Sequence, residues 1–326
     1  MDSFFKAGER GSSVGQEVRA GLTTFLAMAY IIAVNPSLLT QAGIPAAAAV
    51  TATCLGAGVM TILMGLIANR PLACASGMGV NAVFAFTLTG IAGGDWHAAS
   101  AVIFIEGVAI LILVLCGLRE AIMDAIPVSL RHAISVGLGL FIAMIGLADA
   151  GIIVADESTM VALGDVFSPT FLVGLISIIV TIVLYAMNVK GALLLGIILA
   201  VLAGIPLGVT QMPSGIVSGL DFSTFGAPFQ ADEAGIMGIA KVVTNPTLLI
   251  FAFSLMMSDF FDTMGTAMAV AKQGEFLEAD GRVKDIKPIL IVDSAAAAVG
   301  GLVGASSITT FVESASGAAD GGRTGL

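Results

Sequence analysis

Two aspartates, Asp259 and Asp262, lie within an apolar run that extends from residue 248 to residue 271. Because they are three residues apart, on a helix they would share a face with the small residues Gly265 and Ala269, which would let another backbone come close. A carboxylate at membrane depth is costly unless it faces a cavity, a partner or a substrate. The pair therefore predicts a functional site, and the alternative is that an aspartate merely caps a broken helix.

The composition indicates the surroundings of this pair. The chain has 326 residues, of which 57% are hydrophobic and 11% are charged, whereas an ordinary soluble domain carries about 25% charged residues. This predicts an all-α polytopic membrane protein in contact with the lipid bilayer. The net charge of −10 reflects acids that cluster in connecting loops, and it gives no indication of a nucleic-acid partner.

Chemistry other than transport finds little support in the sequence. The three cysteines and the Gly77-Met-Gly79 stretch lack the spacing of a metal site, a disulfide framework or a nucleotide fingerprint, so we expect no cofactor and no metal. An intramembrane aspartyl protease would normally take its two aspartates from different spans, whereas here both lie on one helical turn. The sequence therefore predicts that the protein is not an enzyme.

Apolar segments divide the chain into ten candidate membrane spans, each close to the length needed to cross the hydrocarbon core. In chain order they cover residues 22–39, 46–68, 71–89, 98–115, 132–147, 171–187, 192–209, 248–271, 286–303 and 304–319. A long polar and Gly-rich connection separates the first seven spans from the other three. This predicts three parts, which are residues 1–210, 211–244 and 245–326.

Spans three and ten differ from the others. Span three has Gly77 and Gly79 near its centre, followed by Asn81, and span ten is similarly rich in small residues around Glu313. Such a segment could be a continuous helix, but a Gly-interrupted span is also how transporters expose backbone groups to a ligand at membrane depth, and we favour this interpretation. If spans three and ten correspond, the repeat is seven spans long. Because seven is odd, the second copy would be inverted in the membrane.

The basic residues predict the orientation. With these spans, twelve of the 13 Lys and Arg residues fall on one side of the bilayer and Lys241 falls on the other. The positive-inside rule makes the first side cytoplasmic, and the N-terminus lies on that side. We therefore expect a multi-pass protein of the inner (plasma) membrane of a bacterium, with a cytoplasmic N-terminus.

Four stretches carry a resemblance to a known family: TTFLAMAYIIAVNPSLL in span one, ANRPLACASGMGVNAVFAF in span three, DFFDTMGTAMAVAKQG in span eight and TTFVESASGAADGGRTGL at the end. They are similar to the AzgA-like hypoxanthine/guanine/adenine permeases of the nucleobase–ascorbate transporter (xanthine/uracil permease) family. The resemblance implies fourteen spans in two inverted seven-span repeats, with short extended segments of spans three and ten meeting at the substrate site. It also implies a core domain that moves against a gate domain. This chain would then cover spans one to ten, as a fragment or a truncated protein.

The resemblance also implies the residues at the base. They are Asn81, Gly77 and Met78 of span three, Asp259 and Asp262 of span eight, and Glu313 of span ten. A carboxylate can accept two parallel hydrogen bonds from the N1–H and the exocyclic amine of guanine. The Asp-x-x-Gly pattern favours Asp262 as the ligand and Asp259 as its support, but which of the two contacts the base stays open.

The predicted function is the import of purine nucleobases, namely hypoxanthine, guanine and adenine, by proton symport. Burial disfavours the charged form of Glu313, so this carboxyl could take a proton from the outside and release it inside, with Asp259 as the next candidate for coupling. The alternatives are a uracil, xanthine or anion carrier of the same fold, or a transport-inactive fragment. A homodimer is compatible with this prediction, but the sequence does not specify the oligomeric state.

Overall fold

A computed structural model describes residues 2–118, 128–156, 158–187, 189, 192–210, 219–232, 235–278 and 282–326. The α-helices are α1 (Asp2–Phe5), α2 (Val14–Met28), α3 (Ile31–Gln41), α4 (Ala46–Ile67), α5 (Met78–Ala82), α6 (Thr89–Ile91), α7 (Trp96–Leu115), α9 (Val128–Asp149), α10 (Pro169–Ala186), α11 (Ala192–Gly204), α12 (Gly238–Thr244), α13 (Pro246–Gln273), α14 (Ile286–Val303) and α15 (Ser314–Ala319). The remaining elements are the 3-10 helices η1 (Gly8–Arg10) and η3 (Ala227–Phe229), the π-helical segment η2 (Val83–Leu88) and the strands β1 (Cys74–Ser76), β2 (Ile153–Asp156), β3 (Met160–Leu163) and β4 (Ile308–Thr310).

Six helical segments in the described part of the chain are long and apolar enough to cross a membrane. They are Val14–Gln41, Ala46–Ile67, Trp96–Leu115, Pro169–Ala186, Pro246–Gln273 and Ile286–Val303. Two shorter apolar segments, Met78–Ile91 and Ala192–Gly204, correspond to predicted spans three and seven. The structure therefore confirms a mostly helical membrane protein, while the count of ten spans and the division into three parts stay predictions.

Local sequence explains where several helices begin. The side chain of Asp95 accepts a hydrogen bond from the backbone N–H of His97 at the start of α7, and Asn245 caps α13 in the same way. Such caps satisfy backbone donors that have no partner within the helix. The first span is interrupted once, because α2 ends at Met28 and α3 begins at Ile31, so that the predicted single helix is two helices joined at Tyr30.

The two unusual spans meet as a pair of short strands. Strands β1 and β4 pair antiparallel, with Cys74 opposite Thr310 and Ser76 opposite Ile308. The backbone N–H of Gly77 continues the pair by donating to the carbonyl of Ser307 at 2.9 Å. The prediction that span three is partly extended and not a continuous helix is therefore confirmed, and span ten has the same form.

Side chains of the surrounding helices complete the hydrogen bonding of these strands. The Thr61 hydroxyl of α4 accepts from the N–H of Cys74 and donates to its carbonyl, and the Ser314 hydroxyl accepts from the N–H of Ala73. On the other strand, Asp293 of α14 accepts from the N–H of Thr310 at 2.8 Å. An unsatisfied backbone group costs several kcal/mol in a bilayer, so these contacts permit a two-stranded sheet at membrane depth.

The helices around the strands pack closely because small residues lie at their contacts. A Cβ atom on Gly107 of α7 would lie 2.2 Å from the amide nitrogen of Ala298 in α14, and one on Gly301 would lie 2.4 Å from the amide nitrogen of Phe104. Helix α7 also packs against α13. Close backbone approach through small residues is typical of helices that associate within a membrane.

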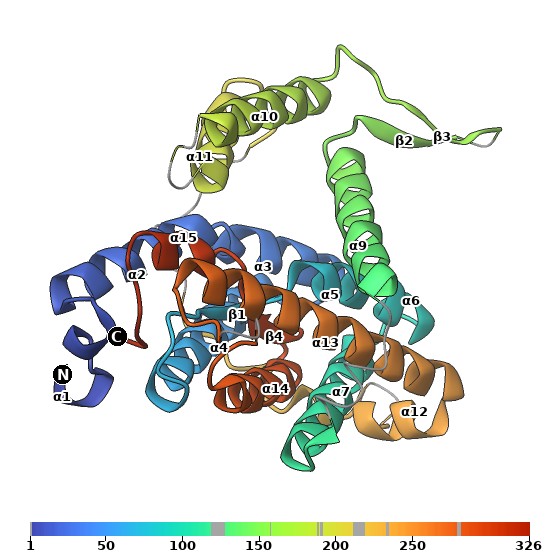
Figure 1. Ribbon diagram of the computed structural model, residues 1–326. Coiled ribbons are helices and arrows are strands. Elements are labelled where there is room, and N and C mark those ends of the chain that lie inside the picture. The colour runs from blue at the N-terminus through green and yellow to red at the C-terminus, as the bar shows by residue number, and fades with distance from the viewer. Residues whose placement is uncertain are drawn as a thin grey trace.

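Helices α9, α10 and α11 extend away from this packed region (Figure 1). Between α9 and α10, strands β2 and β3 form an antiparallel hairpin, with Ile153 opposite Leu163. This segment lies between the predicted spans of residues 132–147 and 171–187, where the sequence analysis predicted no strand, because exposed four-residue strands carry no buried hydrophobic pattern for a sequence to show. Large apolar side chains such as Ile179 and Ile182 remain exposed on α10, as expected for a surface that faces lipid.

Basic residues from three separate segments lie together at one end of the packed region. Arg10 donates to the carbonyl of Asn69, Arg70 pairs with Asp285 at 2.8 Å, and Arg323 pairs with Glu275 at 3.2 Å. Lys241 precedes the start of α13, a helix of 28 residues that at 1.5 Å per residue is about 42 Å long. The structure therefore places Lys241 at the opposite end. Arg119, Lys190 and the side chain of Arg131 lie outside the described residues.

Candidate functional site

The predicted residues of span three lie where β1 passes into α5. Asn81 is fully buried, and its amide nitrogen donates to the carbonyl of Ser76 at 3.3 Å, while its side-chain oxygen has no hydrogen-bond partner among the described residues. A Cβ on Gly77 would lie 3.0 Å from the Thr309 methyl group of β4. Met78 is half-buried and packs against the hydrophobic cluster that contains Phe311 of span ten. Gly77 and Met78 thus lie against span ten, and Asn81 follows them within α5.

The π-helical segment η2 follows these residues directly. In this segment the carbonyl of Phe84 accepts two hydrogen bonds from Thr89, five residues further on, one from its backbone N–H and one of 2.8 Å from its hydroxyl. Such segments are rare and often occur at functional sites. This irregularity supports the assignment of span three to the site.

Glu313 reaches the site from the other strand segment. It is half-buried immediately before α15, and its Oε1 accepts a hydrogen bond of 2.6 Å from the hydroxyl of Tyr30. Tyr30 lies at the junction between α2 and α3. The sequence analysis did not select Tyr30. A signal was present, because the tyrosine hydroxyl is a polar group within the apolar run of span one.

The two aspartates of α13 differ in environment. Asp259 is 1% exposed, whereas Asp262 is exposed and interacts electrostatically with Asp293 and Glu313. Asp262 therefore lies on the side of α13 that faces Glu313. This arrangement is consistent with the predicted roles of ligand for Asp262 and support for Asp259, which stay predictions.

No backbone of the described chain comes close to α13 at Gly265, so a close approach on this face stays a prediction. This glycine is exposed, and a Cβ atom built there would have no atom of the described chain within 4 Å. The close approaches lie instead at Gly107 of α7 and Gly301 of α14, on the helices that pack beside α13. Spacing along one helix cannot show which of its neighbours comes close.

Asp293, in the middle of α14, joins the strands to the helices. Its Oδ1 accepts from the N–H of Thr310 at 2.8 Å and from the hydroxyl of Thr309 at 3.1 Å, and its Oδ2 accepts from the hydroxyl of Thr263 at 2.6 Å. It is fully buried. The sequence analysis placed Asp293 within span nine but gave it no role, since its partners lie in other spans.

Glu106 of α7 is a second residue that the sequence analysis missed. It is 1% exposed and interacts electrostatically with Asp259 and Asp293. The signal was present, because a glutamate in the middle of an apolar run is costly for the same reason as Asp259. The described part of the chain contains no group of three or more His, Cys, Asp or Glu side chains that could hold a metal ion.

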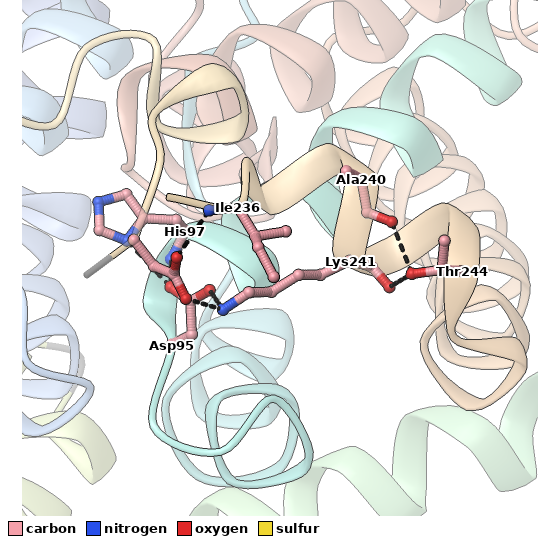
Figure 2. Close-up of polar contacts among 7 residues, drawn as sticks. Asp95, His97, Ile236, Ala240, Lys241 and Thr244 are labelled. Carbon is pink, nitrogen blue, oxygen red and sulfur yellow. Dashed lines mark hydrogen bonds and ion pairs between the residues drawn. The ribbon is translucent and has the colours of Figure 1, made fainter. Parts of the chain in front are cut away.

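A separate polar cluster lies at the start of α7. Figure 2 shows Lys241 extending from α12 towards Asp95 and His97. Lys241 pairs with both Asp95 and Asp232, and Asp95 also contacts His97 Nδ1 at 2.9 Å. Burial acts to raise the pKa of Asp95, but hydrogen bonds from Lys241 and His97 hold that pKa below its ordinary value. Hydrogen bonds to Asp232 and Asp95 raise the pKa of Lys241.

A cavity of about 480 Å³ lies elsewhere, between α2 and α4. Its lining includes the apolar side chains Phe25, Met28 and Ile62, and it includes none of the predicted site residues. We therefore place the candidate site at the strand pair, where the buried polar groups gather, and not in this apolar cavity.

Comparison with known proteins assigns the family. Residues 15–324 match the family model described as Permease family (Xan_ur_permease). The chain belongs to this family, the nucleobase–ascorbate transporters that its motifs resemble. The permease is 37% identical over 334 residues to the guanine/hypoxanthine permease PbuO of Bacillus subtilis, covering 99% of this chain and 74% of PbuO. It is 38% identical over 328 residues to the adenine permease AdeP of Escherichia coli, covering 100% of this chain and 71% of AdeP.

A solved structure shares the fold of the permease. It is the transmembrane domain of the cyanobacterial bicarbonate transporter BicA, which superposes with a TM-score of 0.65 over 96% of this chain and 78% of that chain. The two sequences are 17% identical, so the likeness concerns the fold alone. The family and this fold together show a multi-pass membrane transporter.

Proposed function

We propose that the permease imports purine nucleobases by proton symport. The observation that carries the proposal is a site of buried polar groups at the β1–β4 pair in a chain whose relatives PbuO and AdeP are named as purine permeases. At this site Asn81 of α5, Asp262 of α13 and Glu313 of span ten come from three separate segments. A planar base bound between these segments could form hydrogen bonds along two of its edges.

Hydrogen-bonding capacity supports a purine as the ligand. The side-chain oxygen of Asn81 is an acceptor that no described group uses, and Asp262 offers a carboxylate that can accept two parallel donors. Glu313 is already held by the Tyr30 hydroxyl, which fixes the direction of its second oxygen. Gly77 and Met78 would form the floor beneath the base, because neither presents a charged side chain.

Coupling to protons rests on the carboxyls. Glu313 and Asp259 are the proposed coupling groups, since a carboxyl removed from water is more easily kept in its neutral form. We further propose the inner membrane of a bacterium as the location, with the end that carries Arg10, Arg70 and Arg323 on the cytoplasmic side. A homodimer is compatible with this arrangement.

Uptake of radiolabelled bases by proteoliposomes that contain the full-length protein tests the function. Hypoxanthine, guanine and adenine should accumulate when the outside is acidic, whereas uracil, xanthine and bicarbonate should not. Preferential uptake of uracil or xanthine would show that the substrate is not one of the proposed purines, and bicarbonate uptake would favour an anion carrier of the BicA fold. Accumulation that does not depend on the pH gradient would contradict proton symport.

Replacing Asn81 with alanine should weaken purine binding without preventing folding. One lost hydrogen bond in a desolvated site costs about 1–3 kcal/mol, which corresponds to a rise in Kd of about fivefold to 150-fold. The measurement is equilibrium binding of labelled base to purified protein. Ser37→Ala, at an exposed position of α3, is the control and should leave Kd unchanged. If Asn81→Ala binds as tightly as the wild type, Asn81 is not part of the site.

A further inference from the structure

The most unusual buried group in the described part of the chain is Glu106. It lies halfway along α7 and is 1% exposed, and neither Oε1 nor Oε2 has a hydrogen-bond partner among the described residues. Glu17, which is 3% exposed, is a buried carboxylate with hydrogen-bond donors, because its two oxygens accept from the backbone N–H groups of Arg323 and Thr324. A carboxylate charge without such donors costs several kcal/mol in the interior.

The charged groups that face Glu106 are acidic. Asp259 of α13 and Asp293 of α14 interact with it electrostatically. The other elements packed against α7 are α12, η2, η3 and α6, and of these only α12 carries a titratable residue, Lys241, which is held at the start of α7 by Asp95 and Asp232. Eleven residues separate Asp95 from Glu106, about 16 Å along a helix. No described cation therefore lies beside Glu106.

The basic residues of α13 and α14 are equally remote from this point. Lys272 lies in the last turn of α13 and Lys287 in the first turn of α14, whereas Asp259 and Asp293 are near the middle of these helices. The remaining acid of α13, Asp262, faces Glu313 and Asp293. Glu106 thus shares its surroundings with two carboxyl groups and no compensating charge.

The carboxyl groups of this cluster differ in their hydrogen bonds. Asp293 accepts from one backbone N–H and two hydroxyl groups, and such donors stabilise a carboxylate. Glu106 receives none from the described chain. Neighbouring carboxyls that share a site do not ionise independently, so the carboxyl that receives no donors, Glu106, is the one at which a proton is favoured.

We propose that Glu106 is a proton-binding site of the permease, in which one exchangeable proton is held on an Oε atom beside Asp259, and that Glu106 acts as a further coupling group besides Glu313 and Asp259, so that its proton moves with the base. Binding forms one O–H bond on the Glu106 carboxylate, and release returns the proton to water when the carboxyl reaches solvent. The first part stands on the geometry alone, whereas the second part rests on the proposed symport.

Infrared spectroscopy of the full-length protein in lipid tests the first part. A protonated carboxyl has a C=O stretch that a carboxylate lacks, and the wild type at neutral pH should show this band. Glu106→Gln should remove one such band, while Glu9→Gln, at an exposed residue of the N-terminal segment, should not. A band that survives Glu106→Gln unchanged overturns the site. If Glu106→Gln does not yield folded protein, a wild-type spectrum without the band overturns it equally.

Transport in proteoliposomes tests the second part. Glu106→Gln should lower accumulation of labelled purine driven by a pH gradient at least tenfold and leave exchange of base across the membrane within about twofold, because the site for the base is intact. Glu106→Asp, which can still carry a proton, should recover part of the accumulation. Full pH-driven accumulation in Glu106→Gln overturns the coupling role. If the wild type transports no purine at all, the proposed function fails while the infrared result still decides the site.

Discussion

Helices α7 and α10 have similar composition but opposite environments. Both are strongly apolar and long enough to span a membrane, yet 56% of the most apolar window of α7 is buried and only 11% of that of α10. Helix α7 carries Glu106 and a glycine in backbone contact with α14, whereas α10 presents large aliphatic side chains outward. Hydropathy alone therefore does not distinguish a buried helix near the site from a lipid-facing one. Small residues at helix contacts and a carboxyl group within the apolar run do distinguish them.

The largest effect should come from filling the contact between α7 and α14. Gly107→Val would place atoms about where the Ala298 backbone lies, at 2.2 Å from its nitrogen. Overpacking a core typically costs about 1–3 kcal/mol, and this site lies at the upper end because backbone cannot rotate aside. We expect loss of the monodisperse peak in size-exclusion chromatography of the detergent-solubilised protein.

The matched control for this change lies in α9. Gly146 has no described atom within 4 Å of a Cβ built on it, so Gly146→Val should give a wild-type profile. If both valine variants behave alike, close packing does not distinguish the two regions.

A smaller effect should come from removing the carboxylate that joins α14 to the strands. Asp293→Ala leaves the Thr310 N–H and the hydroxyls of Thr263 and Thr309 without this acceptor, and each buried unsatisfied donor costs about 1–3 kcal/mol. Asp293→Asn keeps one oxygen and should lose less. Thermal unfolding of the purified protein, followed by intrinsic fluorescence, measures both.

Asp156 of the β2–β3 hairpin provides the contrast. It also accepts several hydrogen bonds, from Ser158 and Thr159, and these hold its pKa below the ordinary value, but it is exposed to solvent. Asp156→Ala should therefore leave the unfolding temperature nearly unchanged. A shift as large as that of Asp293→Ala would show that burial is not what makes the acceptor important.

The smallest effect should come from the ion pair at the start of α7. Lys241→Met removes the partner of Asp95, and a partly exposed pair contributes about 1 kcal/mol or less. The pKa of Asp95 is lowered on folding, so its contribution is present above the unfolded value of about 4 and is lost as the pH falls through the folded value. The pKa of Lys241 is raised, so its contribution is lost only at strongly alkaline pH. Unfolding curves of the variant and the wild type should differ at pH 7, and the difference should shrink as the pH falls below about 4. A difference that stays constant as the pH falls below about 4 would contradict this assignment.

The sequence by itself determined which segments form helices and which family they belong to. Polar caps such as Asp95 and Asn245 precede the apolar runs, and these signals are local. Helix α14 therefore matches predicted span nine, and the bounds of α7 and α13 match the predicted spans within about two residues. The Gly-interrupted stretch around Gly77 predicted an extended segment for a similar reason, because glycine weakens a helix at its own position. The motifs that carried the family resemblance are likewise contiguous in the chain.

Only the tertiary structure decided which polar groups meet. The pairing of Cys74 with Thr310 joins residues more than two hundred positions apart, and the donors of Asp293 come from α13 and β4. The different exposure of Asp259 and Asp262 depends on which neighbours cover each face of α13, and nothing in their spacing fixes this. Glu106 stood in the sequence as a charged residue in an apolar run. Its acidic neighbours and its lack of described hydrogen-bond partners became visible only when α7, α13 and α14 were packed together, because a carboxyl's protonation depends on what surrounds it in space.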